Sequence, residues 1–310
     1  MIAIVEAALH HWGLTDARHA LIANRENQVF RIDHAGKSYA LRLHRVGYRS
    51  DGELLSELQW MAALAHGGMQ VPAPVASPLG ETLRTIDGVQ VDLLTWLEGE
   101  PVGSATSGVF VEDRAGLFEI IGQVMARMHQ LSDEWARPAN FTRPAWDRAG
   151  LVGEAPVWDR YWDNPTLSSD DRRLLAKVRR AADRKLAGLH DCLDYGLIHA
   201  DLVRENMLLD GAAIQFIDFD DGGFGFRLFD IATTLLPNLY EPDFPLLKSS
   251  LLDGYRSVRG LEVEALDLFM LIRATTYIGW IMTRMDEGGS KERNARFIKR
   301  ARMLANDYLS

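Results

Sequence analysis

The sequence predicts an α+β fold in which a small lobe built on an antiparallel sheet precedes a larger, mostly helical lobe. Short β-prone runs with turn signals fill most of the first hundred residues, and amphipathic helical patterns fill most of the remainder. A Gly- and Pro-containing segment, Leu97-Glu-Gly-Glu-Pro101, separates the two patterns. We therefore expect an N-terminal lobe over residues 1–98 and a C-terminal lobe over 99–310.

Turn-forming residues divide the first lobe into its predicted strands and helix. Two β-prone runs, 20–33 and 37–45, are joined by a Gly-containing turn, and an Asp-Gly pair joins two further runs, 82–86 and 89–96. Between them, apolar residues recur at spacings of three and four over 51–65, which predicts one amphipathic helix.

The second lobe shows longer helical patterns. An unbroken apolar stripe marks one helix, and serine followed by two aspartates is a helix-start signal for another. Gly222 to Gly225 is expected to be flexible chain. Helices are predicted over 117–131, from 168 or 169 onward, over 226–236, over 262–285 and after 290, with a strand pair over 196–200 and 207–219.

The composition of the chain argues against several classes of protein. The chain has 34 basic and 43 acidic side chains, a formal charge of −9, which disfavours binding to nucleic acid because such binding depends on Lys and Arg neutralising phosphates. A single cysteine, Cys192, excludes an internal disulfide and fits a reducing compartment. The N-terminus lacks a signal-peptide pattern, and no segment is long and apolar enough to cross a membrane. We expect a cytoplasmic protein without a membrane or nucleic-acid partner; no interface stripe indicates an oligomeric state.

The stretch that carries the chemistry begins at the end of the predicted strand over 196–200. It contains His199-x-Asp201, then Asn206, and Asp218 at the end of an apolar run. Phosphoryl transfer needs a carboxylate facing the acceptor hydroxyl and oxygen ligands that gather Mg²⁺ around the phosphates. Asp201 suits the first task, and Asn206 with Asp218 suits the second. An ordinary polar turn between two strands is the alternative.

This stretch resembles the His-x-Asp-x4-Asn and Ile-Asp-Phe-Asp motifs of the aminoglycoside phosphotransferase and choline kinase superfamily, which includes homoserine-kinase-like and bacterial stress-response kinase members. The resemblance implies a two-lobed protein-kinase-like fold, with ATP and Mg²⁺ as cofactors. It implies Asp201 as the catalytic base, Asn206 and Asp218 as metal ligands, and His199 and Asp230 as structural supports of the loop.

The resemblance extends into the N-terminal lobe, which it identifies as nucleotide-binding. Arg42, in Tyr39-Ala-Leu-Arg42, stands where protein kinases carry a lysine that contacts the phosphates. Glu57 is the expected ion-pair partner of Arg42, although Glu53 lies one turn away. Leu94-Thr-Trp-Leu-Glu98 resembles the segment that holds adenine, which makes Glu98 a candidate nucleotide contact.

Aromatic and acidic residues of the second lobe suggest that the molecule which accepts the phosphate carries an ammonium group. Aromatic faces beside carboxylates can bind an ammonium group, although tryptophans also commonly fill helix interfaces. The candidate substrate residues are Trp158, Trp162, Tyr277, Trp280 and Asp220.

The sequence thus predicts an enzyme that transfers the ATP γ-phosphate to the hydroxyl of a small, amine-bearing molecule such as an amino alcohol, a hydroxy amino acid or an aminoglycoside. Three alternatives remain open. They are a Ser/Thr protein kinase of the stress-response type, a non-catalytic nucleotide-binding pseudokinase, and a two-metal phosphohydrolase that uses His199, Asp201, Asp218 and Asp220.

Overall fold

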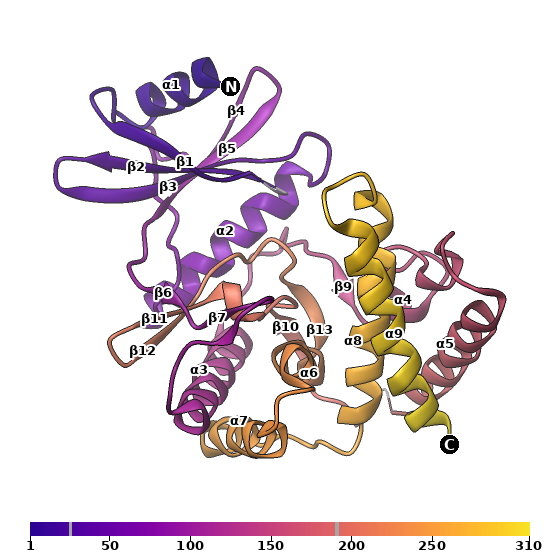
Figure 1. Ribbon diagram of the computed structural model, residues 1–310. Helices are drawn as coiled ribbons and strands as arrows, with labels where there is room; N and C mark the ends of the chain where they lie inside the picture. Colours follow the sequence, from indigo (N-terminus) through magenta and orange to yellow (C-terminus); the bar gives the residue numbers. More distant parts are fainter. Residues whose placement is uncertain (25–26, 190–191) are drawn as a thin grey trace. The chain divides into compact units, whose positions relative to one another are not determined.

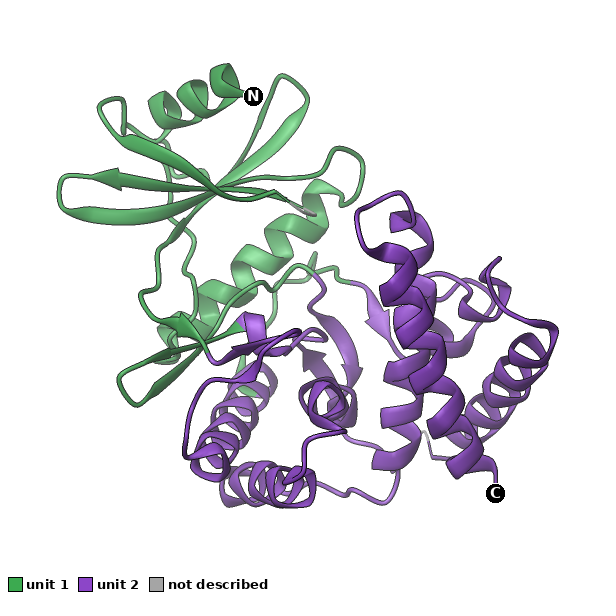
Figure 2. Cartoon of the chain, viewed as in Figure 1, with its two compact units in different colours: residues 1–101, 134–143, 207–220 green, residues 102–133, 144–206, 221–310 purple. Residues whose placement is uncertain are grey.

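The structure is a computed structural model that describes residues 1–24, 27–189 and 192–310 (Figure 1). The chain divides into two compact units, each assembled from three segments (Figure 2). The sequence analysis predicted a first lobe made of one continuous segment, residues 1–98. The first unit of the structure contains two later segments in addition to the N-terminal one. The first unit comprises 1–101, 134–143 and 207–220, and the second comprises 102–133, 144–206 and 221–310.

The first unit is built on a five-stranded antiparallel sheet with strand order β1-β2-β3-β5-β4. Its helices are α1 (Ile2–His11) and α2 (Asp51–His66), and its sheet strands are β1 (Arg18–Asn24), β2 (Gln28–His34), β3 (Lys37–Leu43), β4 (Leu83–Ile86) and β5 (Val89–Thr95). The run expected over 20–33 is thus two strands, and its residues 25–26 lie outside the described residues. Helix α1 was not predicted from the sequence.

The two faces of this sheet carry different chemistry because side chains alternate along a strand. Leu41 and Leu43 of β3 point to one face, where they pack with Val5 and Leu9 of α1. Arg42, between them, points to the opposite face, where it pairs with Glu57 of α2. Figure 1 shows α1 and α2 on the two sides of the sheet.

Helix α2 begins at a capping box. The Ser50 side chain accepts a hydrogen bond from the Glu53 backbone N–H, and the Glu53 carboxylate accepts one from the Ser50 backbone N–H. Glu53 therefore stabilises the start of the helix, and Glu57, one turn later, faces the sheet.

A second, three-stranded sheet of the first unit has the order β12-β11-β6, formed by β6 (Glu100–Pro101), β11 (Met207–Asp210) and β12 (Ala213–Phe216). The predicted pairing of 196–200 with 207–219 is wrong. Gly211, at φ 60°, turns the chain so that β11 pairs with β12 instead.

The second unit is mostly helical. Its longer helices are α3 (Arg114–Glu134), α5 (Ser169–Leu189), α6 (Arg227–Leu235), α7 (Phe244–Val258), α8 (Leu266–Trp280) and α9 (Ser290–Leu309). The shorter elements are β7 (Gly103–Ser104), β8 (Gly108–Val109), β9 (Ala145–Trp146), α4 (Arg148–Val152), η1 (Tyr161–Asp163), β10 (Tyr195–Ile198), η2 (Arg204–Asn206), β13 (Gly223–Phe226), η3 (Leu236–Asn238) and η4 (Ile281–Arg284).

The glycine-rich stretch after the acidic cluster is a strand rather than the flexible chain predicted. β13 pairs antiparallel with β10 and parallel with β9. A Cβ at Gly223 would collide with the carbonyl oxygen of Pro144, so glycine there permits the close approach of the chain before β9. This sheet fixes the strand from which the predicted catalytic loop emerges.

Helices α5, α8 and α9 share an apolar core that includes Val178, Leu271 and Ala305. The helix expected over 262–285 begins at Leu266 and gives way to the 3₁₀ turn η4 after Trp280. Within residues 1–24, 27–189 and 192–310, none of the helices is both long enough and apolar enough to cross a membrane.

Candidate active site

The predicted catalytic loop leaves β10 through a strained backbone conformation. Ala200 has φ 66°, a region that side-chain-bearing residues seldom occupy. The Asp230 carboxylate on α6 accepts hydrogen bonds from the backbone N–H of His199 (2.8 Å) and of Ala200 (2.7 Å). Both bonds are buried, so Asp230 holds the loop in this conformation at the residue before Asp201.

A buried histidine that the sequence analysis did not single out lies behind Asp230. His129 of α3 contacts Asp230 Oδ2 through Nε2 (3.1 Å) and the Tyr255 hydroxyl through Nδ1 (2.8 Å). Burial lowers the pKa of His129 well below its ordinary value, and Arg227 adds to the shift. A neutral His129 that donates from Nε2 to the Asp230 carboxylate accepts at Nδ1 from the Tyr255 hydroxyl. Burial also raises the pKa of Asp230, against the effect of its hydrogen bonds.

Asp201 is held at both carboxylate oxygens. Oδ1 accepts a hydrogen bond from Arg273 Nη2 (2.7 Å), and Oδ2 accepts one from Asn206 Nδ2 (3.0 Å). A quarter of the Asp201 side chain remains exposed. Burial raises the pKa of Asp201, and the Arg273 guanidinium opposes that shift. The ring of His199, itself buried, accepts the Asp201 backbone N–H at 3.4 Å.

The two predicted metal ligands belong to different units. Asn206 ends η2 in the second unit, and its amide nitrogen donates to the backbone oxygen and to Oδ2 of Asp201. This leaves the Asn206 side-chain oxygen as the atom suited to a hard cation such as Mg²⁺. Asp218 follows β12 in the first unit and has φ 67°.

Arg42 lies in a buried ion-pair cluster on the α2 face of the first sheet. Its Nε and Nη2 donate to the two oxygens of Asp92 (2.9 and 2.7 Å), the residue opposite it in register on β5. Its Nη1 donates to Glu57 (2.7 Å), so the structure shows the predicted Arg42–Glu57 pair and leaves Glu53 as a cap. Three of the five guanidinium N–H groups are thus bound to carboxylates.

Two further residues complete this cluster. Arg143 donates to the second oxygen of Glu57 (3.1 Å), and His44 Nε2 lies 2.8 Å from Asp92 Oδ2. Burial alone would raise the pKa of Glu57, but Arg42 and Arg143 outweigh it and hold that pKa below its ordinary range. Burial opposes the same shift at Asp92, whose pKa is lowered by Arg42 and His44.

Glu98 and Asp220, both in the first unit, differ in their exposure to solvent. Glu98 is exposed and lies 3.7 Å from Arg31. Asp220 is buried, and its backbone oxygen accepts from Arg143 (2.6 Å) and Arg49 (3.1 Å). Asp220 belongs to a different unit from the aromatic substrate candidates.

Two of the aromatic candidates, Trp158 and Tyr277, enclose Arg273, the arginine that donates to Asp201. The Arg273 guanidinium carbon lies 4.6 Å from the ring centre of Trp158 and 4.4 Å from that of Tyr277. These distances are typical of cation–π contacts. In the structure the cation between these two rings is Arg273, where the sequence analysis expected a substrate ammonium.

The other two aromatic candidates also face arginines. The guanidinium carbon of Arg179 lies 4.1 Å from the ring centre of Trp162, and that of Arg284 lies 4.3 Å from the ring centre of Trp280. Trp162 is buried and Trp280 half-buried.

Sequence reasoning missed Asp92 and Arg273, the residues that fix Arg42 and Asp201. Each is a charged residue inside an apolar run, in Val-Asp-Leu-Leu and in Met-Leu-Ile-Arg-Ala. A charge in such a position signals a buried pair. The partner could not be named, because it lies 50 residues away for Asp92 and 72 for Arg273.

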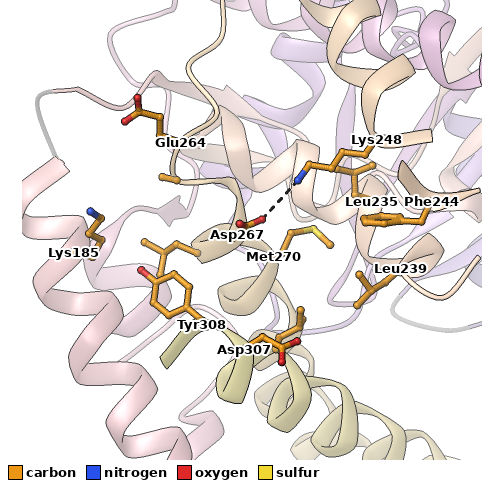
Figure 3. Close-up of a pocket in the computed structure, with 13 residues that line it drawn as sticks. Lys185, Leu235, Leu239, Phe244, Lys248, Glu264, Asp267, Met270, Asp307 and Tyr308 are labelled. Carbon is orange, nitrogen blue, oxygen red and sulfur yellow. Dashed lines mark ion pairs between the residues drawn. The ribbon is translucent and has the colours of Figure 1, made fainter. Parts of the chain in front are cut away.

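A cavity of about 500 Å³ opens elsewhere in the second unit (Figure 3). Leu235, Leu268 and Met270 form part of its apolar wall, and Lys248 and Asp267 form an ion pair of 3.7 Å at it. None of its 13 lining residues is a predicted site residue. The cavity is therefore not the predicted catalytic site.

The loop after β10, braced by Asp230, presents Asp201 and Asn206, residue types that phosphoryl transfer uses. The chain matches the phosphotransferase enzyme family over residues 19–266 and belongs to that family. The predicted family and enzyme class are confirmed.

Two of the curated relatives are small-molecule kinases by name. The chain is 27% identical to amicoumacin kinase of Bacillus subtilis (strain 168) over 252 residues, 78% of this chain and 69% of that one. It is 27% identical to homoserine kinase of Sinorhizobium medicae (strain WSM419) over 268 residues, 84% of this chain and 76% of that one.

Solved structures confirm the predicted fold class. A microcompartment-associated aminopropanol kinase aligns with a TM-score of 0.85 and 28% identity, over 100% of this chain and 98% of that one. Amicoumacin kinase hAmiN, in complex with AMP-PNP, Ca²⁺ and Ami, aligns with a TM-score of 0.77 and 22% identity, over 99% and 93%.

Proposed function

We propose that this phosphotransferase moves the γ-phosphate of ATP, with Mg²⁺, to the hydroxyl of a small amine-bearing molecule. The observation that carries the proposal is the position of Asp201, which is held through both carboxylate oxygens in a loop braced by Asp230. Relatives named for homoserine and aminopropanol support a hydroxy amino acid or an amino alcohol as the acceptor.

Asp201 is the proposed proton acceptor. The acceptor oxygen forms a bond to the γ-phosphorus, the bond from that phosphorus to the bridging oxygen of ADP breaks, and the hydroxyl proton passes to Asp201. Because hydrogen bonds fix both Asp201 oxygens, the carboxylate is oriented before the acceptor binds.

Asn206 and Asp218 are the proposed metal ligands. Both offer side-chain oxygens, the ligand type that Mg²⁺ prefers. The Asn206 amide nitrogen donates its hydrogen bonds to Asp201, so its side-chain oxygen is the atom that would face the metal. Bound Mg²⁺ neutralises charge on the phosphates. Arg42 would contact the nucleotide through the terminal N–H groups that Asp92 and Glu57 do not use.

The test is ADP formation from Mg-ATP with 1-amino-2-propanol, ethanolamine, L-homoserine, kanamycin or casein as the acceptor. Turnover with one small alcohol is expected, and Asp201→Asn should lower kcat by about 10²–10⁴-fold, the usual contribution of a general base. The matched control is Asp183→Asn, which alters a half-buried aspartate of α5 that accepts from Arg148.

Transfer to casein alone would favour a protein kinase instead. Full activity of Asp201→Asn would remove Asp201 from the mechanism. Phosphate release from phosphoesters without ATP would indicate a phosphohydrolase.

A further inference from the structure

Arg273 of α8 is a fully buried cation beside the proposed base. Its side chain has no exposed surface, and Nη2 donates to Asp201 Oδ1 (2.7 Å) and to the Tyr277 hydroxyl (3.0 Å). Within the described part of the chain, its Nε and Nη1 have no hydrogen-bond partner. Asp201 is thus its one carboxylate contact there.

Aromatic rings enclose the rest of the guanidinium. The ring centres of Trp158, Tyr277 and Phe229 lie 4.6, 4.4 and 5.3 Å from its central carbon. Gly279 permits this enclosure, because a Cβ there would collide with the carbonyl oxygen of Trp158. The packing leaves Arg273 little freedom to leave Asp201.

The fold alone does not account for this arginine. Burying a guanidinium with a single carboxylate carries a large desolvation cost, and well-packed apolar residues in place of buried ion pairs often leave stability unchanged or higher. The neighbours of Arg273 are already aromatic, so a long apolar side chain would suit the same space. A role at Asp201 explains why a cation is present.

We propose that Arg273 is a positioning residue that fixes the Asp201 carboxylate toward the acceptor hydroxyl. This inference rests on the proposed function. Arg273 holds Oδ1 and Asn206 holds Oδ2, so the plane of the carboxylate is set from two sides. Without Arg273, one side is free, and Asp201 samples orientations in which neither oxygen faces the hydroxyl.

The inference also reassigns the aromatic cluster around Arg273. Trp158 and Tyr277 hold the arginine that orients the base, and so they act on catalysis without touching the acceptor. The acceptor amine would then be bound by other groups.

The test compares Arg273→Met with wild type, using whichever of 1-amino-2-propanol, ethanolamine, L-homoserine or kanamycin the wild type phosphorylates. Met fills the space between the rings, so the variant should fold. We expect kcat to fall about 100-fold, as for a misplaced catalytic group, with KM for ATP unchanged. Wild-type kcat in a folded Arg273→Met would overturn the inference.

Chemical rescue separates positioning from a structural role. Arg273→Ala opens a space the size of a guanidinium between the rings, and guanidinium chloride at concentrations well below denaturing should restore much of the lost kcat. Sodium chloride at the same ionic strength should not. If Arg273→Ala folds and guanidinium does not restore its activity, the inference is contradicted. If Arg273→Ala does not fold, the kcat of Arg273→Met is the test of the inference.

The matched control is Arg302→Ala. Arg302 also donates to an aspartate, Asp171, at 2.7 and 2.8 Å, but outside the site. Its kcat should equal that of wild type. A wild type inactive on all four acceptors overturns the proposed function and this inference together, whereas an active wild type with an equally active Arg273→Met overturns the inference alone.

Discussion

The two units each bury an arginine against carboxylate, and they do so differently. In the first unit, Arg42 uses three N–H groups on Asp92 and Glu57, and Arg143 supplies a second cation. In the second unit, Arg273 meets one carboxylate and is otherwise surrounded by aromatic rings. The first cluster balances its own charge and is built as a rigid framework. The second leaves its acid, Asp201, a quarter exposed and able to meet another molecule.

Arg42→Met should give the largest effect on stability. The change leaves the Asp92 and Glu57 charges buried with fewer partners, and breaking a buried pair in this way costs about 3–5 kcal/mol. Arg273→Met should cost much less, because water can reach the Asp201 carboxylate. Urea denaturation of both variants measures the difference, and equal losses would show that the two clusters are energetically alike.

Asp92→Asn should lower the free energy of unfolding by about 1.5–3 kcal/mol at neutral pH, the range for hydrogen bonds to a charged group. Arg42 and His44 hold the folded-state pKa of Asp92 below its unfolded value of about 3.9, despite burial. The ionised carboxylate therefore stabilises the fold above that value and loses this contribution as pH falls below it.

The gap between wild type and Asp92→Asn should accordingly be constant above about pH 5 and narrow as the pH falls past the unfolded pKa. Denaturation at a series of pH values checks this. A gap that widens in acid would contradict the ionised state of Asp92.

Gly279→Ala tests the aromatic enclosure in the second unit. The added Cβ meets the Trp158 backbone, and overpacking of this kind costs about 1–3 kcal/mol. Displacing Trp158 from Arg273 should also lower kcat. The matched control is Gly188→Ala near the end of α5, where a Cβ meets nothing within 4 Å, so this variant should not lose stability.

Tyr277→Phe should have the smallest effect. It removes the hydroxyl that accepts from Arg273 Nη2 and keeps the ring, so the loss is that of one hydrogen bond, about 0.5–1.5 kcal/mol. Because Arg273 keeps its bond to Asp201, kcat should change only slightly. Loss of kcat as great as in Arg273→Met would show that the hydroxyl, and not the guanidinium, orients the base.

The same contrast explains what the sequence could predict. Asp201, Asn206 and Asp218 lie in one short stretch, so their spacing is readable without a structure. The Arg42–Glu57 pair was predicted from the family resemblance, which places both residues in the N-terminal lobe. Asp92 depends on the register between β3 and β5, and Arg273 on where α8 packs, and both are set by long-range contacts. The sequence analysis expected these aromatic rings to face a substrate ammonium, and in the structure they face arginines of the chain.

The segmented first unit has a consequence for synthesis on the ribosome. The five strands of its larger sheet, including Arg42, are complete by residue 101, but Arg143 and the β11–β12 hairpin come from 134–143 and 207–220. Glu57 therefore has only Arg42 as a cationic partner until Arg143 has emerged from the ribosome. The first unit cannot complete its folding until residue 220 has left the exit tunnel. A nascent chain arrested near residue 101 should therefore remain protease-sensitive and bind chaperones. The N-terminal sequence completes its folding only when segments that lie far along the chain have been synthesised.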